Sequence, residues 1–183
     1  ACAQAVADAG GAVAVVAALQ AHPNVAGVQV LGCTALSRIA ASSTACAQTV
    51  ANAGGVLTVL AALQAHPSDL NVQWNGCAAL SRIAAGSTAC AQAVADAGGA
   101  VAVVAALQAH PNVAGVQVLG CTALSRIAAS STACAQTVAN AGGVLTVLAA
   151  LQAHPSDLNV QWNGCAALSR IAAGSTACAQ AVA

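Results

Sequence analysis

The sequence predicts an all-α fold, a solenoid in which each repeat of 44 residues contributes three helices. Residues 1–88 recur without a change as residues 89–176. Each block of 88 divides into two halves, unit A and unit B, which differ at 14 of 44 aligned positions. Gly-Gly and His-Pro pairs interrupt every unit at fixed places, and no stretch alternates apolar and polar residues as a half-buried strand does. Repeats of this kind are typical of chains that stack similar helical units.

One solenoid domain is predicted over residues 1–183. Its repeats are residues 1–44, 45–88, 89–132 and 133–176, in the order A-B-A-B, and residues 177–183 begin a fifth copy. The identity of the two 88-residue blocks is compatible with recent duplication, with consensus design, or with a sequence assigned to a periodic object. Neither terminus carries the polar, atypical repeat that usually caps a solenoid, so we expect adhesive ends or a longer array.

Helix-breaking and capping residues predict where the first two helices of a repeat begin and end. The short first helix is expected over residues 89–97, with Thr88 as its N-cap. The second helix starts at the Gly-Gly pair 54–55 and ends at His66, because the residue before Pro67 is displaced from helical geometry. A histidine at this end is expected to bond the last carbonyls of its own helix.

The third helix is expected from about Leu70 to Ala85, with Ser68 and Asp69 as candidate N-caps. Its core-facing positions are spaced as one face of a helix, and in the second repeat they are Val72, Gly76, Leu80 and Ile83. Small side chains allow close approach, so Gly32 and Gly76 predict tight helix crossings.

The composition is poor in charge and rich in apolar residues. Charged residues make up 4% of the chain, hydrophobic residues 59%, and the formal net charge is zero. Such a chain has weak colloidal repulsion and tends to associate. The longest apolar runs, such as Ala12 to Leu19, are far shorter than the roughly 20 residues of a spanning helix, so no membrane insertion is expected. No targeting or lipidation motif is visible, and the compartment is left open.

Nine cysteines occupy two fixed places in the repeat. One series is Cys2, Cys46, Cys90, Cys134 and Cys178, and the other is Cys33, Cys77, Cys121 and Cys165. Both places are predicted to face the core, where a free thiol behaves as a small hydrophobe. Bridges between the two series and metal binding are weaker alternatives, since no Cys-x-x-Cys or Cys/His pair at ligand spacing occurs. No cofactor and no metal are expected.

Each unit resembles the armadillo repeat, and the resemblance covers the whole chain. It rests on Ala-Gly-Gly before an apolar helix (residues 53–55), a turn with a proline, and the pattern VQxxGCxALSxIA from Val72 to Ala84. The resemblance implies a right-handed α-solenoid whose third helices line a concave groove for extended peptides or partner domains. In the family, an Asn of the third helix commonly holds the peptide backbone, one turn after a Trp. Here the Asn position holds Arg38, Arg82, Arg126 and Arg170, and the Trp position holds Thr34, Ala78, Thr122 and Ala166.

All four positive charges therefore lie at one repeat position. They are expected to form a row along the groove, roughly 10 Å apart, the usual separation of packed helices. Trp74 and Trp162 precede the Arg by eight residues in the B units and edge the same strip, which suits an acidic peptide or a stacked planar group. Further groove candidates on the same helices are Thr34, Asn75, Thr122 and Asn163. The alternative is a structural Arg that pairs with Asp8, Asp96 or a helix C-terminus.

Two functions from different classes follow from these observations. The first is a non-enzymatic scaffold that binds a protein or an acidic peptide in the concave groove. The second is a structural subunit, or a segment of a filament, that self-associates through uncharged Ala-rich faces. Four Arg and a zero net charge argue against nucleic acid as a partner. An enzyme is not expected, because each polar residue recurs in a line instead of converging with unlike groups in one pocket.

Overall fold

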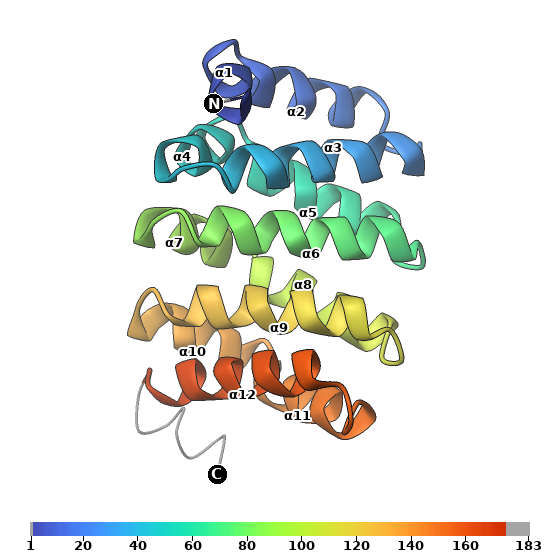
Figure 1. Ribbon diagram of the computed structural model, residues 1–183, viewed down its shortest axis with the longest axis vertical. Coiled ribbons are helices and arrows are strands. Elements are labelled where there is room, and N and C mark those ends of the chain that lie inside the picture. The colour runs from blue at the N-terminus through green and yellow to red at the C-terminus, as the bar shows by residue number, and fades with distance from the viewer. Residues whose placement is uncertain (1, 175–183) are drawn as a thin grey trace.

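The computed structural model describes residues 2–174, which form twelve α-helices in one stack (Figure 1). The first helices of the repeats are α1 (Cys2–Asp8), α4 (Thr44–Asn52), α7 (Thr88–Asp96) and α10 (Thr132–Asn140). The second helices are α2 (Gly11–Ala21), α5 (Gly55–Ala65), α8 (Gly99–Ala109) and α11 (Gly143–Ala153). The third helices are α3 (Ala26–Ala40), α6 (Leu70–Ala84), α9 (Ala114–Ala128) and α12 (Leu158–Ala172). The predicted all-α fold with three helices per repeat is confirmed, while the expected start of a fifth repeat lies outside the described residues.

The third helices lie side by side like rungs, with the second helices behind them (Figure 1). The most extensive contacts between repeats join α3 to α6, α6 to α9, and α9 to α12. Because the helices are nearly parallel and the units have equal length, equivalent residues of successive third helices line up along one face. We call this surface the third-helix face.

The Gly-Gly pair makes the sharp bend between the first and second helices of a repeat. Gly54 has a φ of 83°, in the left-handed region that side chains rarely adopt. Its neighbour Gly55 begins α5, and a Cβ at Gly55 would lie 2.7 Å from the carbonyl oxygen of Val50. The first glycine is thus needed for its backbone conformation and the second for space, which explains why the pair recurs.

The helices on either side of this bend are short. Within residues 2–174, no single helix is long and apolar enough to span a membrane. Four bent pairs of first and second helices reach the required length and composition together, with bends of 68° to 72°.

The histidine after each second helix connects neighbouring repeats. The backbone N–H of His66 donates to Ala62 O and so closes the end of α5. The imidazole does not bond the carbonyls of its own helix, and that prediction was wrong. His66 Nε2 lies 2.8 Å from the carbonyl oxygen of Pro23 in the preceding repeat, because successive His-Pro turns lie side by side. The same contact recurs from His110 and His154.

The N-cap of the first helix is Ser87 and not Thr88. The hydroxyl of Ser87 accepts a hydrogen bond from the backbone N–H of Cys90 at 3.1 Å. Thr88 is the first residue inside α7, so the sequence placed this cap one residue too late. An N-cap residue precedes the helix, and its side chain accepts a hydrogen bond from the backbone N–H of the third helical residue. A residue within the first turn cannot form this bond.

The third helix has a side-chain cap only in the B units. The carboxylate of Asp69 accepts from the backbone N–H groups of Asn71 and Val72, which identifies Asp69, and not Ser68, as the N-cap of α6. The A units have Val25 at the equivalent position, with no side-chain cap. The four third helices therefore begin and end at equivalent positions but differ in their N-cap residue.

A buried glutamine in the third helix closes the end of the second helix. The side-chain amide of Gln73 is 2% exposed and donates to Leu63 O at 2.8 Å and to His66 O at 3.0 Å. These carbonyls belong to the last turn of α5 and the turn after it, where no helical partner is available. The equivalent bonds recur in every repeat, from Gln29, Gln117 and Gln161.

Replacing Gln73 with Met is expected to lower the free energy of unfolding by about 2 kcal/mol, because two carbonyls lose their buried donor. Methionine has nearly the same length, so the change isolates the hydrogen bonds from the packing. Urea unfolding followed by circular dichroism measures the loss. Gln64→Met, on the exposed side of α5, is the matched control and should change stability by less than about 0.5 kcal/mol. Equal losses from both variants would refute this role for Gln73.

The core is continuous through the stack and is made of Ala, Val, Leu, Ile and Cys side chains. The predicted face of α6 is confirmed, with Val72, Leu80 and Ile83 all 0% exposed. The predicted tight crossing at Gly76 is also present, since a Cβ there would lie 2.5 Å from a methyl carbon of Leu63 on α5. Close approach of second and third helices therefore fixes the position of the third-helix face.

Candidate functional site

The four Arg side chains stand in the last turns of the four third helices. Arg38, Arg82 and Arg170 are exposed, and Arg126 is half-buried. Because the third helices lie side by side, the sequence-predicted Arg residues come together as one row on the third-helix face. We call this set the Arg row.

The central members of the Arg row lie near each other. Arg82 and Arg126 both line a hollow of about 160 Å³, together with Ser43 and Thr44 at the start of α4. Burial, and secondly the positive charge of Arg82, lower the pKa of Arg126 from its ordinary value. An anionic group at this place would offset the repulsion between the two guanidinium groups.

A second hollow, of about 390 Å³, adjoins Arg126 one repeat further along. It is also lined by Ser87 and Thr88 at the start of α7. The sequence prediction did not include these hydroxyl residues in the site, although a Ser-Thr pair ends every unit. The Ser-Thr pairs were therefore visible in the sequence, but their position beside the Arg row depends on how one repeat packs on the next.

The four carboxylates of the chain are engaged away from the Arg row. Asp8 and Asp96 accept hydrogen bonds from Gln4 and Gln92 of their own helices, at 2.8 and 2.7 Å. The remaining two carboxylates cap third helices, as described for Asp69. The alternative in which Arg pairs with Asp8 or Asp96 is therefore not what the structure shows. The other part of that alternative stays open, because each Arg lies in the last turn of its third helix, where the helix dipole favours a positive charge.

The two Trp side chains lie on the third helices of the second and fourth repeats. Trp74 is 45% exposed and packs over Gly115 of α9, where a Cβ would lie 3.1 Å from the indole Nε1. Trp162, in the last repeat, is 77% exposed. One face of the Trp74 indole therefore packs at the boundary between the second and third repeats, and the other face is exposed to solvent.

The predicted groove residues Thr34, Asn75, Thr122 and Asn163 lie between neighbouring third helices. The hydroxyl of Thr34 lies 2.7 Å from Asn75 Oδ1, and the Asn75 amide donates to Asn71 O. Thr122 and Asn163 repeat this arrangement at 2.9 Å. The structure therefore brings each Thr-Asn pair together as a polar contact within an A-B boundary.

Comparison with known proteins identifies the architecture. No family model and no curated protein sequence matches this chain. Among solved structures, an engineered protein from a structural genomics programme is 30% identical, with a TM-score of 0.84 over 94% of this chain and 67% of that one. A designed armadillo repeat protein is 25% identical, with a TM-score of 0.87 over 98% of this chain and 72% of that one. The protein is an armadillo-like repeat solenoid.

Another designed armadillo repeat protein matches this armadillo-like solenoid with a TM-score of 0.86 and 20% identity, over 98% of this chain and 72% of that one. It was solved in complex with the peptide (KR)4. This likeness shows that the armadillo-like solenoid described here has the same fold as that protein.

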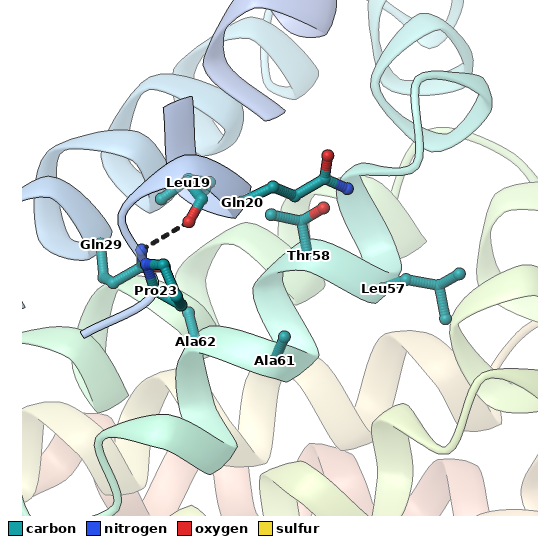
Figure 2. Close-up of a pocket in the computed structure, with 8 residues that line it drawn as sticks. All are labelled: Leu19, Gln20, Pro23, Gln29, Leu57, Thr58, Ala61 and Ala62. Carbon is teal, nitrogen blue, oxygen red and sulfur yellow. Dashed lines mark hydrogen bonds between the residues drawn. The ribbon is translucent and has the colours of Figure 1, made fainter. Parts of the chain in front are cut away.

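Two equivalent hollows lie on the second-helix side of the armadillo-like solenoid, at the A-B boundaries. The larger, of about 290 Å³, lies between α2 and α5 (Figure 2), and the smaller, of about 180 Å³, lies between α8 and α11. The Gln29 amide in the wall of the larger hollow is bonded to Leu19 O (dashed line in Figure 2), and the Thr58 hydroxyl is bonded to Gly54 O. Gln20 is the further side-chain amide in the lining of the larger hollow.

The cysteines of the armadillo-like solenoid are thiols of the core. All eight within residues 2–174 are free, and of these only Cys2 and Cys165 are exposed. Burial raises the pKa of Cys33, Cys77 and Cys121 to about 12. The alternative of bridges between the two series is not realised among these eight, and Cys178 lies outside the described residues. Over the same range, no three His, Cys, Asp or Glu side chains are grouped to hold a metal ion.

Proposed function

We propose that this armadillo-like solenoid binds an extended acidic peptide, or an acidic segment of a partner protein, along the third-helix face. The observation that carries the proposal is the Arg row, four like charges on one surface whose carboxylate counterparts bond elsewhere. A guanidinium group binds carboxylates through a planar fork of donors, so Arg suits this partner better than Lys would. The alternative drawn from composition, packing through Ala-rich faces, concerns other surfaces of the chain.

The spacing of the Arg row favours a peptide in polyproline II conformation. Packed helices lie roughly 10 Å apart. Three residues of a polyproline II helix advance about 9 Å and return a side chain to the same side. An acidic residue at every third position would therefore meet one Arg in each repeat.

The sign of the charge distinguishes this face from that of the similar designed protein. That protein was solved with (KR)4, a basic peptide. The Arg row of the present chain would repel such a ligand, so (KR)4 is expected not to bind. The two peptides (DE)4 and (KR)4 have the same length and opposite charge, which makes (KR)4 the matched control ligand.

The double variant Arg82→Ala plus Arg126→Ala is expected to weaken binding of fluorescent (DE)4 by about ten-fold, because each exposed ion pair contributes up to about 1 kcal/mol. Fluorescence anisotropy at low ionic strength measures the affinity, which should fall as salt is added. The control variant Gln64→Ala plus Gln152→Ala changes exposed residues of second helices and should bind like the parent. Unchanged affinity of the Arg variant, or equal binding of (KR)4, would overturn the proposal.

A further inference from the structure

Two members of the Arg row share one hollow, and the other two lie outside it. Arg82 reaches the hollow of about 160 Å³ from α6, and Arg126 reaches it from α9, so neighbouring repeats contribute one guanidinium group each. Arg38 and Arg170 do not line it. We call this place the two-Arg hollow. It collects two positive charges, whereas Arg38 and Arg170 each contribute one at their own place in the row.

The rest of the lining of the two-Arg hollow is small and uncharged. A volume of about 160 Å³ is room for about five water molecules, at roughly 30 Å³ each. The hollow therefore matches a phosphate group, with its four oxygens, in size. No carboxylate of residues 2–174 lines it to offset the two charges. Its remaining residues are Ala40, Ala41, Ser43, Thr44, Ala85 and Gly86.

Three helix ends lie in this lining and add partial charges to it. Ser43 is the N-cap of α4, and Ala41 and Ala85 are the C-caps of α3 and α6. The N-terminus contributes about +0.5 and the two C-termini about −0.5 each, against the two full charges of the Arg side chains, so the hollow keeps a net charge of about +1.5. The Arg pair therefore decides the sign, and an anion is attracted.

The hydroxyl groups at the start of α4 differ in what they can offer a ligand. The Ser43 hydroxyl is engaged, because it accepts a hydrogen bond from the backbone N–H of Cys46 at 3.1 Å. Thr44 is the exposed first residue of α4, so its hydroxyl can donate to an anion in the hollow. Arg82, Arg126 and Thr44 thus surround the hollow with donors from three helices.

Two Arg side chains at one place suit a phosphate better than a carboxylate. A carboxylate carries one negative charge and leaves one guanidinium group unbalanced. A phosphate monoester carries about −1.5 to −2 at pH 7 and has three acceptor oxygens, which Arg binds through the parallel donors of its fork. At Arg38 and Arg170, outside the hollow, a single carboxylate matches the single charge.

We infer that the two-Arg hollow binds the phosphate group of a phosphoserine or phosphothreonine residue in the acidic segment of the partner. This inference rests on the proposed function and adds regulation to it, because phosphorylation of the partner strengthens its binding. One such phosphate binds per chain at this pair of Arg. The next hollow along the stack, at Ser87 and Thr88, is lined by Arg126 alone among the Arg residues, and Arg126 is already engaged in the two-Arg hollow.

Two fluorescent peptides test the inference. They share the sequence DEDEXDEDE and have Asp or phosphoserine at the central position X. The parent chain is expected to bind the phosphoserine peptide about ten-fold more tightly, because the phosphate forms additional charge-assisted hydrogen bonds. Fluorescence anisotropy at low ionic strength measures both dissociation constants. We call their ratio the phosphate preference.

Arg82→Ala plus Arg126→Ala is expected to reduce the phosphate preference from about ten-fold to about two-fold or less, because the phosphate loses both forks. The matched control is Arg38→Ala plus Arg170→Ala, which removes the same charge from the Arg row and leaves the two-Arg hollow intact. It should weaken binding of both peptides and keep the phosphate preference at about ten-fold. Arg82→Ala alone, at an exposed side chain, gives a second variant of the hollow, and helical circular dichroism shows that each variant is folded.

The two peptides separate this inference from the proposed function. If the parent binds the Asp peptide and the phosphoserine peptide equally well, the proposed function stands and the inference is overturned. An equal loss of phosphate preference in the two double variants would overturn it as well, because the phosphate would then respond to the charge of the whole Arg row. If neither peptide binds the parent, the proposed function fails and the inference fails with it.

Discussion

Raising the pH from 8 to 10 under reducing conditions is expected to lower the free energy of unfolding by about 4 kcal/mol. Burial raises the pKa of Cys33, Cys77 and Cys121 from 9.0 to about 12 in the folded chain. Between these two pH values the unfolded chain releases thiol protons that the folded chain retains, so stability falls as the pH rises. At pH 10 each thiol accounts for about 1.4 kcal/mol, the equivalent of one pKa unit.

The composition limits the side chains that can cause this pH dependence. The chain contains no Tyr and its four Lys and Arg residues are all Arg, so cysteine is the only side chain that ordinarily titrates between pH 8 and 11. Urea unfolding at pH 8, 9 and 10, followed by helical circular dichroism, gives the dependence directly. The stabilising contribution of the neutral thiols should be complete below pH 9 and decrease steadily above it.

Removal of a single buried thiol tests this effect. Cys77→Ala removes one buried thiol and should reduce the loss between pH 8 and 10 by about one third. If the parent unfolds at the same urea concentration at pH 8 and pH 10, the buried thiols do not control alkaline stability.

The elements of the fold were predictable because their signals are local. A Gly-Gly pair, a His-Pro pair and an aspartate before an apolar run each act within a few residues, so helix ends came within one or two residues of their observed places. The exact period predicted the arrangement of the repeats, since units of equal length with similar cores stack in the same way. Local rules failed at the cap of the first helix, where Ser87 and Thr88 are both good capping residues, and at His66, whose imidazole contacts the preceding repeat.

The contacts between repeats were not predictable because they depend on an offset that no local pattern encodes. Thr34 meets Asn75, 41 residues later, although the repeat is 44 residues long. His66 likewise meets Pro23, 43 residues earlier. These offsets depend on how far neighbouring helices are shifted along each other when they pack. The side chains at these contacts provide little sequence signal. Sequence reasoning therefore named these Thr and Asn residues one by one and did not predict that they bond each other.

Leu80→Ala is expected to lower the free energy of unfolding by about 3 to 4 kcal/mol. Leu80 is 0% exposed on α6, and its equivalents Leu36 and Leu124 are also 0% exposed. Truncation removes three buried carbons and leaves a cavity, because the surrounding helices are held by contacts on both sides and cannot close around it. Urea unfolding at pH 7 measures the loss, with the parent and variant compared at equal concentration.

The same truncation in the last repeat separates packing within a repeat from packing between repeats. Leu168 is the equivalent residue of α12 and is only partly buried, so Leu168→Ala is expected to cost about half as much. In a solenoid, stability is approximately a sum of repeat terms and nearest-neighbour terms. Leu80 contributes to a unit with neighbours on both sides, whereas Leu168 has a preceding repeat only among the described residues. Equal losses from the two variants would mean that neighbour packing contributes little, and that each unit of 44 residues is stable largely through its own three helices.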